Sequence, residues 1–590
     1  MPDPFDGDKP DGPGIEALYT HLFQLWGEVR TEMSSMDSFH DGTFAVWADE
    51  MDKRPFIHPP TGRYLIDHAV DTQMSVEPTI KKFPAGEGAE HKKRANQVEP
   101  GLMAVMLDAA MKEPMIPWRQ GYRHLIQYGY TVIGVEWDEM GKLKEPKRKE
   151  GEGDDDWKER QDEYEAGRVG WNPIRIKAPH PSRVLMNPLE TQPDIAVIVA
   201  QRYSQDLYNL TKRKGRYGSK FVGTYAVDAN PYRLVKTYEV WTANWHTLKV
   251  AGQDILVQEQ NPFKFQPYSH GFAGWGGEIV DTGADSESSS NFPKQMAVGM
   301  LAGVKELLTM QSREESAKHN AVLEHGFAHM GTRIPAEEAA QQMEGPPDKL
   351  LQGEQDDWWF LKYPEISQYV FKHGEEVNTE LERATYSRMQ AGERQVGITT
   401  VGQQQILFQA SNKKFYVPTK QIERLATIAA RNILKMVVET GETLTIGGKR
   451  LAPVDIEKSY DVRVEFKQVD PLIQMELSRE SRENVKVGAI SLETHRENMG
   501  MENEDEEVKR LLNEEVMKLP AVHEEMLALA VKQAGFKDLG DHMLEMMAAQ
   551  RQQALMAARG QPASAGPSAD GQGALGAQPA HTTMPLGGGP

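Results

Sequence analysis

Glycine-rich loops, histidine pairs and acidic clusters could each do chemistry in this sequence, but none has the spacing that a known catalytic site needs. The text closest to a phosphate-binding loop, residues 447–450 (GGKR), lacks the spacing and the hydroxyl that bind phosphate and magnesium. His325 and His329 are four residues apart, yet no H-E-x-x-H is present and Gly326 is expected to break the helix there. The chain has no cysteine and no G-x-S-x-G elbow, and carboxylate pairs are expected by chance among 87 acidic residues. We therefore expect no enzyme, no metal site and no cofactor.

The charge balance of the 590 residues is acidic, with 67 Lys and Arg against 87 Asp and Glu and a formal charge of -20. Such a surface argues against a protein that grips DNA, since Lys and Arg supply most of the sequence-independent affinity for phosphates. It does not exclude a DNA partner that is enclosed without being held. No apolar run approaches the ~18 residues of a membrane-spanning helix, so no membrane partner is expected.

The N-terminal half alternates helical and strand patterns, which predicts an α+β fold. Apolar residues recur at helical spacing from Ile15 to Met33, and a second helix is expected near 98–111. Strands are predicted from runs of Val, Ile, Tyr and Trp at 129–137, 195–203, 234–242 and 247–257. The stretch 139–168 carries 19 charged residues in 30, which favours a solvated loop or polar helix over a metal site.

Two long helices with a small module between them are predicted next. The first runs unbroken from Pro293 to Gly326, about 50 Å at ~1.5 Å per residue, apolar in its first half and polar in its second. Gly299 and Gly303 would let a neighbouring backbone come close. The second begins at Pro364, and the residues between them, 327–363, contain short extended pieces at 331–335 and 358–361.

The C-terminal part returns from a glycine-interrupted segment, 391–402, to helices and short strands. Helices are expected near 403–410 and from Pro418 to Gly441, and strands at 444–446 and 460–466. Residues 471–560 hold 17 acidic and 11 basic residues in a predicted helical bundle. The last thirty residues are rich in Gly, Ala and Pro, which is typical of disorder.

This order of parts resembles the portal proteins of tailed double-stranded DNA bacteriophages. Their wing, stem, clip, returning stem, tunnel loop and crown follow one another in the same sequence, and the resemblance covers nearly all of residues 15–560. Local text is also similar to the family, at 130–138 (YTVIGVEWD), 178–184 (APHPSRV), 238–241 (YEVW), 267–271 (PYSHG) and 486–491 (KVGAIS) leading to Glu506 and Glu507. The charged insertion at 139–168 and the long tail depart from the pattern.

The resemblance implies an α+β, mainly α, portal-type ring subunit with an α/β wing, a helical stem, a small α/β clip and a helical crown. The implied divisions are the N-terminal part of the wing (1–290), stem helix 1 (291–326), clip (327–363), stem helix 2 (364–390), tunnel loop (391–402), long helix with the C-terminal part of the wing (403–470), crown (471–560) and tail (561–590). Such a protein forms a homo-dodecamer at one capsid vertex, in a virion made in the host cytoplasm. Its expected partners are double-stranded DNA without sequence specificity, terminase, the major capsid and scaffolding proteins, and head-tail adaptor proteins.

Particular residues are expected to serve such a channel. Arg388, Arg394, Lys413 and Lys414 are candidate DNA contacts or, alternatively, surface bases and intersubunit partners, and the mobile loop is attributed to Gly392, Gly397 and Gly402. Trp358, Trp359 and Phe360 are candidates for a local core, a subunit contact or a terminase-docking site. Lateral packing between copies is expected for the stem residues Met296, Met300, Val304, Leu307, Val377 and Leu381, with burial within the wing as the alternative for the first three.

Two other functions stay open on the sequence alone. A hydrolase or nuclease using acidic residues with magnesium would need converging carboxylates, and no spacing singles out such a set. A helical scaffold or adaptor without a channel would share the helices but would not close into a ring.

Overall fold

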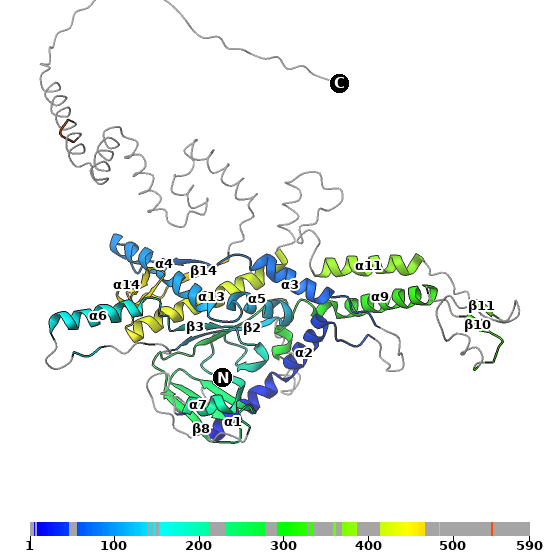
Figure 1. Cartoon of the computed structure of the whole chain (residues 1–590), viewed down its shortest axis with the longest axis horizontal. Coiled ribbons are helices and arrows are strands. Elements are labelled where there is room, and N and C mark those ends of the chain that lie inside the picture. The colour runs from blue at the N-terminus through cyan, green and yellow to red at the C-terminus, as the bar shows by residue number, and fades with distance from the viewer. Residues whose placement is uncertain are drawn as a thin grey trace, which may run out of the picture. The chain divides into compact units, whose positions relative to one another are not determined.

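The protein combines helices with antiparallel sheets, and the predicted α+β class is confirmed. The computed structural model describes residues 5, 9–46, 56–138, 142, 146–148, 153–211, 230–277, 292–326, 330–335, 337, 358–360, 368–385, 413–466, 483 and 544–546. The chain divides into two compact units, Met1–Gln468 and Val469–Pro590, and almost all described residues belong to the first (Figure 1). The predicted loop at 391–402, helix at 403–410, bundle at 471–560 and tail at 561–590 lie outside the described residues, apart from four positions of the bundle.

Two consecutive helices open the chain where one was predicted. Helix α1 (Gly12–Leu25) begins at Asp11, whose carboxylate accepts a hydrogen bond from Gly14 N at 2.9 Å, and α2 (Gly27–Asp41) follows directly. The break falls at Trp26, which is buried and donates its indole N–H to Met186 O at 2.8 Å. Anchoring this side chain to a distant strand decides where the helix bends.

A three-stranded sheet with helices around it forms the centre of the first unit. Its order is β3-β2-β9 with both pairings antiparallel, and every residue of β2 is buried, as expected for a glycine-bounded run of branched and aromatic residues. Helix α13, predicted from Pro418, contacts β2, β9 and α5 through its apolar stripe. The bounds are β2 (Tyr130–Trp137), β3 (Ile174–Lys177), β9 (Tyr268–Phe272), α3 (Thr61–Gln73), α4 (Ala89–Met111), α5 (Pro117–Tyr128) and α13 (Tyr416–Thr440).

Strands from the two ends of this unit pair with one another. Strand β1 (Thr79–Lys82) is antiparallel to β14 (Val462–Glu465), with Thr79 opposite Glu465. A short hairpin, β12 (Leu444–Ile446) with β13 (Lys449–Leu451), and α14 (Pro453–Ile456) lie beside α4. The segments before residue 280 and after residue 413 therefore share one core, which makes 292–385 an insertion into it.

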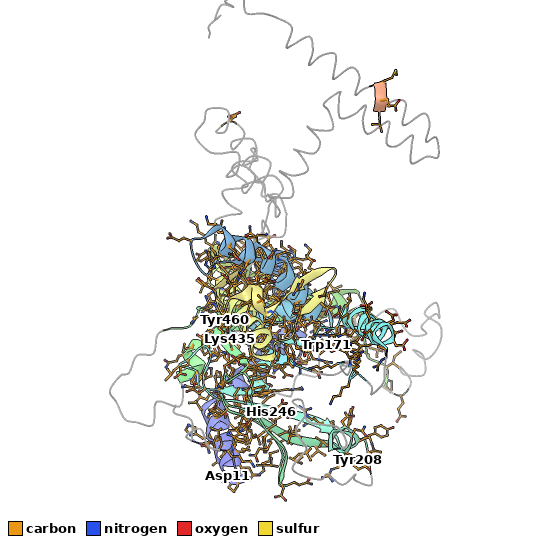
Figure 2. The ribbon with its side chains drawn as sticks, turned by 90° about the vertical axis from the view of Figure 1, so that its left-hand side faces the viewer. Asp11, Trp171, Tyr208, His246, Lys435 and Tyr460 are labelled. Atoms are coloured by element: carbon orange, nitrogen blue, oxygen red, sulfur yellow. The ribbon has the colours of Figure 1, made fainter. Side chains whose placement is uncertain are left out.

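A second, five-stranded antiparallel sheet has the order β4-β5-β6-β7-β8. The single strand predicted at 247–257 is wrong, because the chain turns at 251–254, where Gly252 has φ +69°, and makes a hairpin of two strands. Helix α7 (Ser204–Thr211) packs on β5, and Figure 2 labels Tyr208 on this helix and His246 in the sheet. The strands are β4 (Val184–Met186), β5 (Ala196–Tyr203), β6 (Leu234–Trp241), β7 (Trp245–Val250) and β8 (Ile255–Gln260), and the 3-10 turn η1 (Pro181–Arg183) precedes β4.

The predicted unbroken helix from Pro293 to Gly326 is also wrong. It consists of α8 (Phe292–Met296), a non-helical crossing, a 3-10 turn η3 (Ala302–Val304) and α9 (Lys305–Gly326). At the crossing, Met300 N donates to Ile126 O at 2.7 Å, and a Cβ on Gly299 would lie only 2.0 Å from Gln127 O. Contact with the end of α5 replaces helical hydrogen bonds here. The close approach predicted at Gly299 is confirmed, whereas a Cβ on Gly303 would meet nothing within 4 Å.

The remaining described elements are α6 (Asp154–Arg168), β10 (Met330–Thr332), β11 (Trp358–Phe360), α11 (Gln368–Ala384) and the 3-10 turn η4 (Lys413–Phe415). Helix α6 lies in the charged segment and buries none of its fifteen residues, as expected for a polar helical excursion. In the described part of the chain, every helix is too short or too polar to cross a bilayer.

Candidate functional site

Helices α9 and α11 pack against each other and make up the predicted stem (Figure 1). Near the body their contact is apolar, with Leu308 and Leu381 buried. Further along it becomes polar, because Gln311 Nε2 donates to Asn378 Oδ1 at 2.8 Å and His373 forms an ion pair with Glu314. The change from apolar to polar along α9, predicted from its sequence, is confirmed.

Four of the six predicted stem-packing residues are buried within one chain. Met300, Val304, Val377 and Leu381 are between 2% and 6% exposed and belong to the main core, while Met296 and Leu307 are partly buried. These four side chains are therefore covered by their own chain, where the crossing at 297–304 folds the segment before α9 onto the body. Packing between copies stays a prediction.

Lys414 caps the C-terminal end of α11. Its ammonium donates to Ala384 O and to Thr385 O, the latter at 3.3 Å, although much of the side chain is exposed. A cation at the carboxyl end of a helix satisfies free carbonyls and interacts favourably with the helix dipole. Desolvation of this ammonium lowers the pKa of Lys414. The stem is thus joined to η4 and α13 through one of the bases that the sequence suggested for DNA contact.

The other candidate channel residues are placed only in part. Lys413 is exposed beside Lys414. Arg388, Gly392, Arg394, Gly397 and Gly402 lie outside the described residues.

The predicted extended pieces at the tip pair with each other. Strands β10 and β11 are antiparallel, with Gly331 opposite Trp359 and Met330 opposite Phe360. The side chain of Trp359 is 43% exposed, and the guanidinium of Arg333 lies 5.9 Å from its ring centre. An indole with this exposure is available for contact with another molecule, and the three predicted roles of these residues stay predictions. Trp358 shares β11, and only the backbones of Trp358 and Phe360 are described.

The stem helices carry an acidic surface. Together α9 and α11 contain eight acidic and five basic residues. Two of the basic side chains contact α2 and the segment after it instead of solvent. Lys305 pairs with Glu32 at 2.6 Å, and Arg313 Nε donates to Val46 O at 2.8 Å. Glu375, Glu376 and Glu380 are exposed on α11. This surface would repel the phosphates of DNA.

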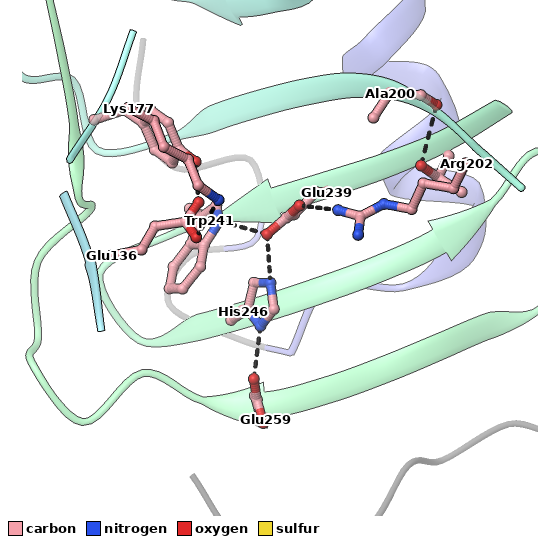
Figure 3. A network of polar contacts seen from close by, with 10 residues as sticks. Glu136, Lys177, Ala200, Arg202, Glu239, Trp241, His246 and Glu259 are labelled. Carbon is pink, nitrogen blue, oxygen red and sulfur yellow. Dashed lines mark hydrogen bonds and ion pairs between the residues drawn. The ribbon is translucent and has the colours of Figure 1, made fainter. Parts of the chain in front are cut away.

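A buried row of charged side chains crosses the five-stranded sheet (Figure 3). His246 Nδ1 lies 2.7 Å from Glu259 Oε1 and its Nε2 lies 3.0 Å from Glu239 Oε1, with all three residues at most 5% exposed. Arg202 pairs with Glu239 at 2.7 Å, and the Trp241 ring stacks on the imidazole at 4.0 Å. Ionised carboxylates only accept hydrogen bonds, so this geometry fits an imidazolium between two carboxylates. Buried carboxylates need such partners, and these contacts join β5, β6, β7 and β8 across the sheet.

The carboxylates of this row cannot share a metal, because they lie on opposite sides of the imidazole ring. More generally, within the residues that the structure describes, no three His, Asp or Glu side chains converge as metal ligands.

A second hydrogen-bonded chain links Ser182, His180, Tyr128 and Asp37, and sequence reasoning missed it. Ser182 N and Oγ lie 3.3 and 2.7 Å from His180 Nδ1, His180 Nε2 lies 3.1 Å from Tyr128 Oη, and Tyr128 Oη donates to Asp37 Oδ1 at 2.5 Å. Because Ser182 N–H donates to Nδ1, that nitrogen is unprotonated and Nε2–H points to the tyrosine. Burial lowers the pKa of His180 and raises that of Tyr128.

A serine hydroxyl beside a histidine nitrogen resembles a serine activated by a histidine base. Here, however, His180 Nδ1 also accepts a hydrogen bond from the backbone N–H of Ser182. His180 caps the 3-10 turn η1, which leads into β4. We therefore assign the chain of hydrogen bonds to fixing this turn against α2 and α5. The only sequence signal was the Pro-His-Pro-Ser text at 179–182, which marks a turn and not its distant partners.

Comparison with known proteins adds no assignment. No family model matches the chain, and no curated protein matches it.

Proposed function

We propose that the chain is the portal subunit of a tailed double-stranded DNA bacteriophage. Twelve copies would form a ring at one capsid vertex, through which DNA enters during packaging and leaves during ejection. The ring would also bind terminase and later the head-tail adaptor proteins, with the capsid and scaffolding proteins around it.

The observation that carries this proposal is the insertion of an antiparallel helix pair, with a two-stranded module between its helices, into an α/β body. Both ends of the insertion return to that body, at the Gly299 crossing against α5 and at Lys414 on the end of α11. Pairing of β1 with β14 closes the body around them. A wing, stem and clip in that order would have this topology.

Charge supports a conduit over a DNA-binding protein. Twelve copies at -20 each would carry a formal charge of -240, and the stem helices contribute acidic residues to it. A wall that repels phosphates on every side keeps a duplex centred, whereas a basic wall would release counterions and bind it. The sequence also lacks a nucleotide-binding loop, which fits a ring through which a separate ATPase moves the DNA.

Electron microscopy of the purified full chain is the decisive experiment. Negatively stained particles, made alone and by co-production with the capsid and scaffolding proteins, should show end-on rings with a central hole. A chain that stays monomeric in both preparations contradicts the proposal. Particles that assemble without a central hole would favour the scaffold or adaptor, and cleavage of DNA by the purified chain with magnesium would favour the nuclease.

A further inference from the structure

The charged helix α6 is the feature that the proposed function leaves unexplained. It carries seven acidic and three basic residues, and none of its fifteen residues is buried. Its described contacts are polar, because Arg168 pairs with Glu442 and Gly170 N donates to Thr445 O at 2.9 Å beyond its C-terminal end, while Arg148 pairs with Asp154 at its N-terminal end. Helices of this length are marginal in water without a packed face. An extended polar helix with no buried residue is therefore expected to gain stability from a partner.

The aromatic residues of α6 lie together with arginines on one face. Trp157, Arg160, Tyr164 and Arg168 follow at spacings of three and four and are half-buried, while their neighbours are exposed. Arg160 lies 5.5 Å from the Trp157 ring centre and Arg168 lies 5.5 Å from that of Tyr164. Arg160 also donates to Lys147 O at 3.2 Å, so this face is engaged within the chain, whereas Glu159 and Glu163 on the other side of the helix are exposed.

A basic surface of opposite character lies on the β1–β14 pair. Lys81 and Arg463 are directly opposite each other in the register, and both point outward because their neighbours Ile80, Val462 and Val464 are buried. Like charges directly across a strand pair are destabilising. Arg463 pairs with Glu465 at 2.7 Å.

Two more exposed lysines, Lys92 and Lys93, lie on α4, the helix that packs on β1. Within the described residues, Lys81, Lys92 and Lys93 form no ion pair. The surface therefore has the charge to accept an acidic partner.

The two surfaces are attached to α13 at separate places. Strand β14 is fixed beside Thr427, whose hydroxyl accepts from Val464 N at 3.0 Å, whereas α6 is fixed at Glu442. Glu442 lies just beyond the end of α13 at Thr440, and the helix between Thr427 and Thr440 spans roughly 20 Å. A closed ring of identical subunits needs two different, complementary surfaces on each subunit. An acidic helix and a basic strand pair on one chain meet that requirement.

We propose that α6 of one copy docks on the basic surface formed by β1, β14 and the start of α4 of the neighbouring copy. This inference rests on the proposed ring. Its chemistry is ionic, between the exposed face of α6 that carries Glu159 and Glu163 and the basic side chains of the neighbouring copy. Salt is expected to weaken the contact, because added ions shorten the distance over which exposed charges attract, which is about 8 Å at physiological ionic strength.

Charge reversal on both surfaces tests the pairing. The variants are E159K/E163K on α6, K81E/R463E on the strand pair, and the four substitutions combined. The matched control, D206K/D254K, adds the same charge as the α6 variant at two exposed acidic residues of α7 and the turn before β8. Circular dichroism and thermal unfolding check folding, and native mass spectrometry with negative stain measures the fraction assembled at 50 and 300 mM salt.

Each single-surface variant should raise the concentration for half-assembly by about tenfold or more at low salt. The control should assemble like the wild type, and the combined variant should recover assembly. If wild-type rings form and E159K/E163K assembles like the control, this inference is overturned while the proposed function stands. Loss in both single-surface variants without recovery in the combination also overturns the pairing. If the wild type itself forms no ring, the proposed function fails.

Discussion

At the scale of single residues, the absence of a Cβ at Gly299 allows the chain to cross close to α5, and the helix is interrupted there. The carbonyl of Gln127 occupies the place where any Cβ would lie, at 2.0 Å. The helical pattern that runs through this position in the sequence therefore cannot be realised.

Replacing Gly299 with Ala should destabilise the chain by about 3 kcal/mol or more, because backbone atoms on both sides would have to move. Urea unfolding of the unassembled chain measures this. The matched substitution Gly303→Ala should be within about 1 kcal/mol of the wild type, since its Cβ would meet nothing within 4 Å. Equal midpoints for the two variants would show that the crossing is not tight.

Two buried histidines should make the protein sensitive to acid. Desolvation lowers the pKa of His124 to about 3 and that of His270 to about 4, from 6.5. Below pH 6.5 the unfolded chain binds protons that the folded chain does not, so stability is complete above that pH and falls as the pH decreases towards 4. At pH 5 each histidine should cost about 2 kcal/mol.

Urea unfolding at pH 7 and pH 5 measures this loss. His270→Asn should reduce the difference between the two pH values, although it lowers stability at pH 7 because His270 Nε2 bonds Asn187 O at 2.9 Å. His21→Asn, at an exposed position, should leave the difference unchanged. An unchanged difference in H270N would exclude His270 as a cause.

At the scale of elements, the stem is anchored inside one chain and only its outer part is polar. Leu381 is 3% exposed in the isolated subunit, so Leu381→Ala should lower the free energy of unfolding of the unassembled chain by about 2–5 kcal/mol. Met310→Ala, on the exposed side of α9, should change it by less than about 0.5 kcal/mol. Should L381A instead unfold like the wild type and fail only in assembly, Leu381 would pack between copies.

For the two-stranded tip module we expect a substitution to affect binding and not folding. Trp359 is exposed, so Trp359→Ala should leave folding and ring formation intact while weakening binding of the packaging terminase at least tenfold. Biolayer interferometry with assembled rings measures that binding. M310A serves again as a control, since its side chain is similarly exposed on α9. Unaltered terminase binding by W359A would leave Trp359 without this role, and loss of rings would make it a subunit contact.

At the scale of the whole molecule, the net acidic charge and the few basic residues near the predicted tunnel loop (391–402) would set the electrostatic environment of DNA in the proposed channel. If the chain forms the proposed channel, Arg394→Ala should alter the length of DNA packaged or its retention, because a guanidinium in an acidic channel would be a strong local contact for phosphate. Packaged length by pulsed-field electrophoresis and leakage by nuclease sensitivity are the measurements. Lys413 follows the predicted tunnel loop in the sequence. The variant Lys413→Ala tests whether removing any basic residue near the loop has the same effect as removing Arg394. Normal packaging and retention in R394A would remove Arg394 from the DNA path.

Much of the architecture was determined by the sequence itself. Strand β2, helix α13, the polar helix α6, the change of character along α9 and the extended pieces at the tip all follow from local periodicity and turn residues, which act over a few residues. The acidic charge and the absence of cysteine excluded several chemistries in the same way.

Only the tertiary structure decided where continuous patterns break and which groups meet. Trp26 bonded to Met186, Gly299 against Gln127, His246 between two glutamates and Lys414 on the end of α11 all join positions whose partners lie elsewhere along the chain. A periodic pattern records which side of an element is buried but not what covers it. Contacts between elements can therefore override local preference, and they become visible only when the chain is folded.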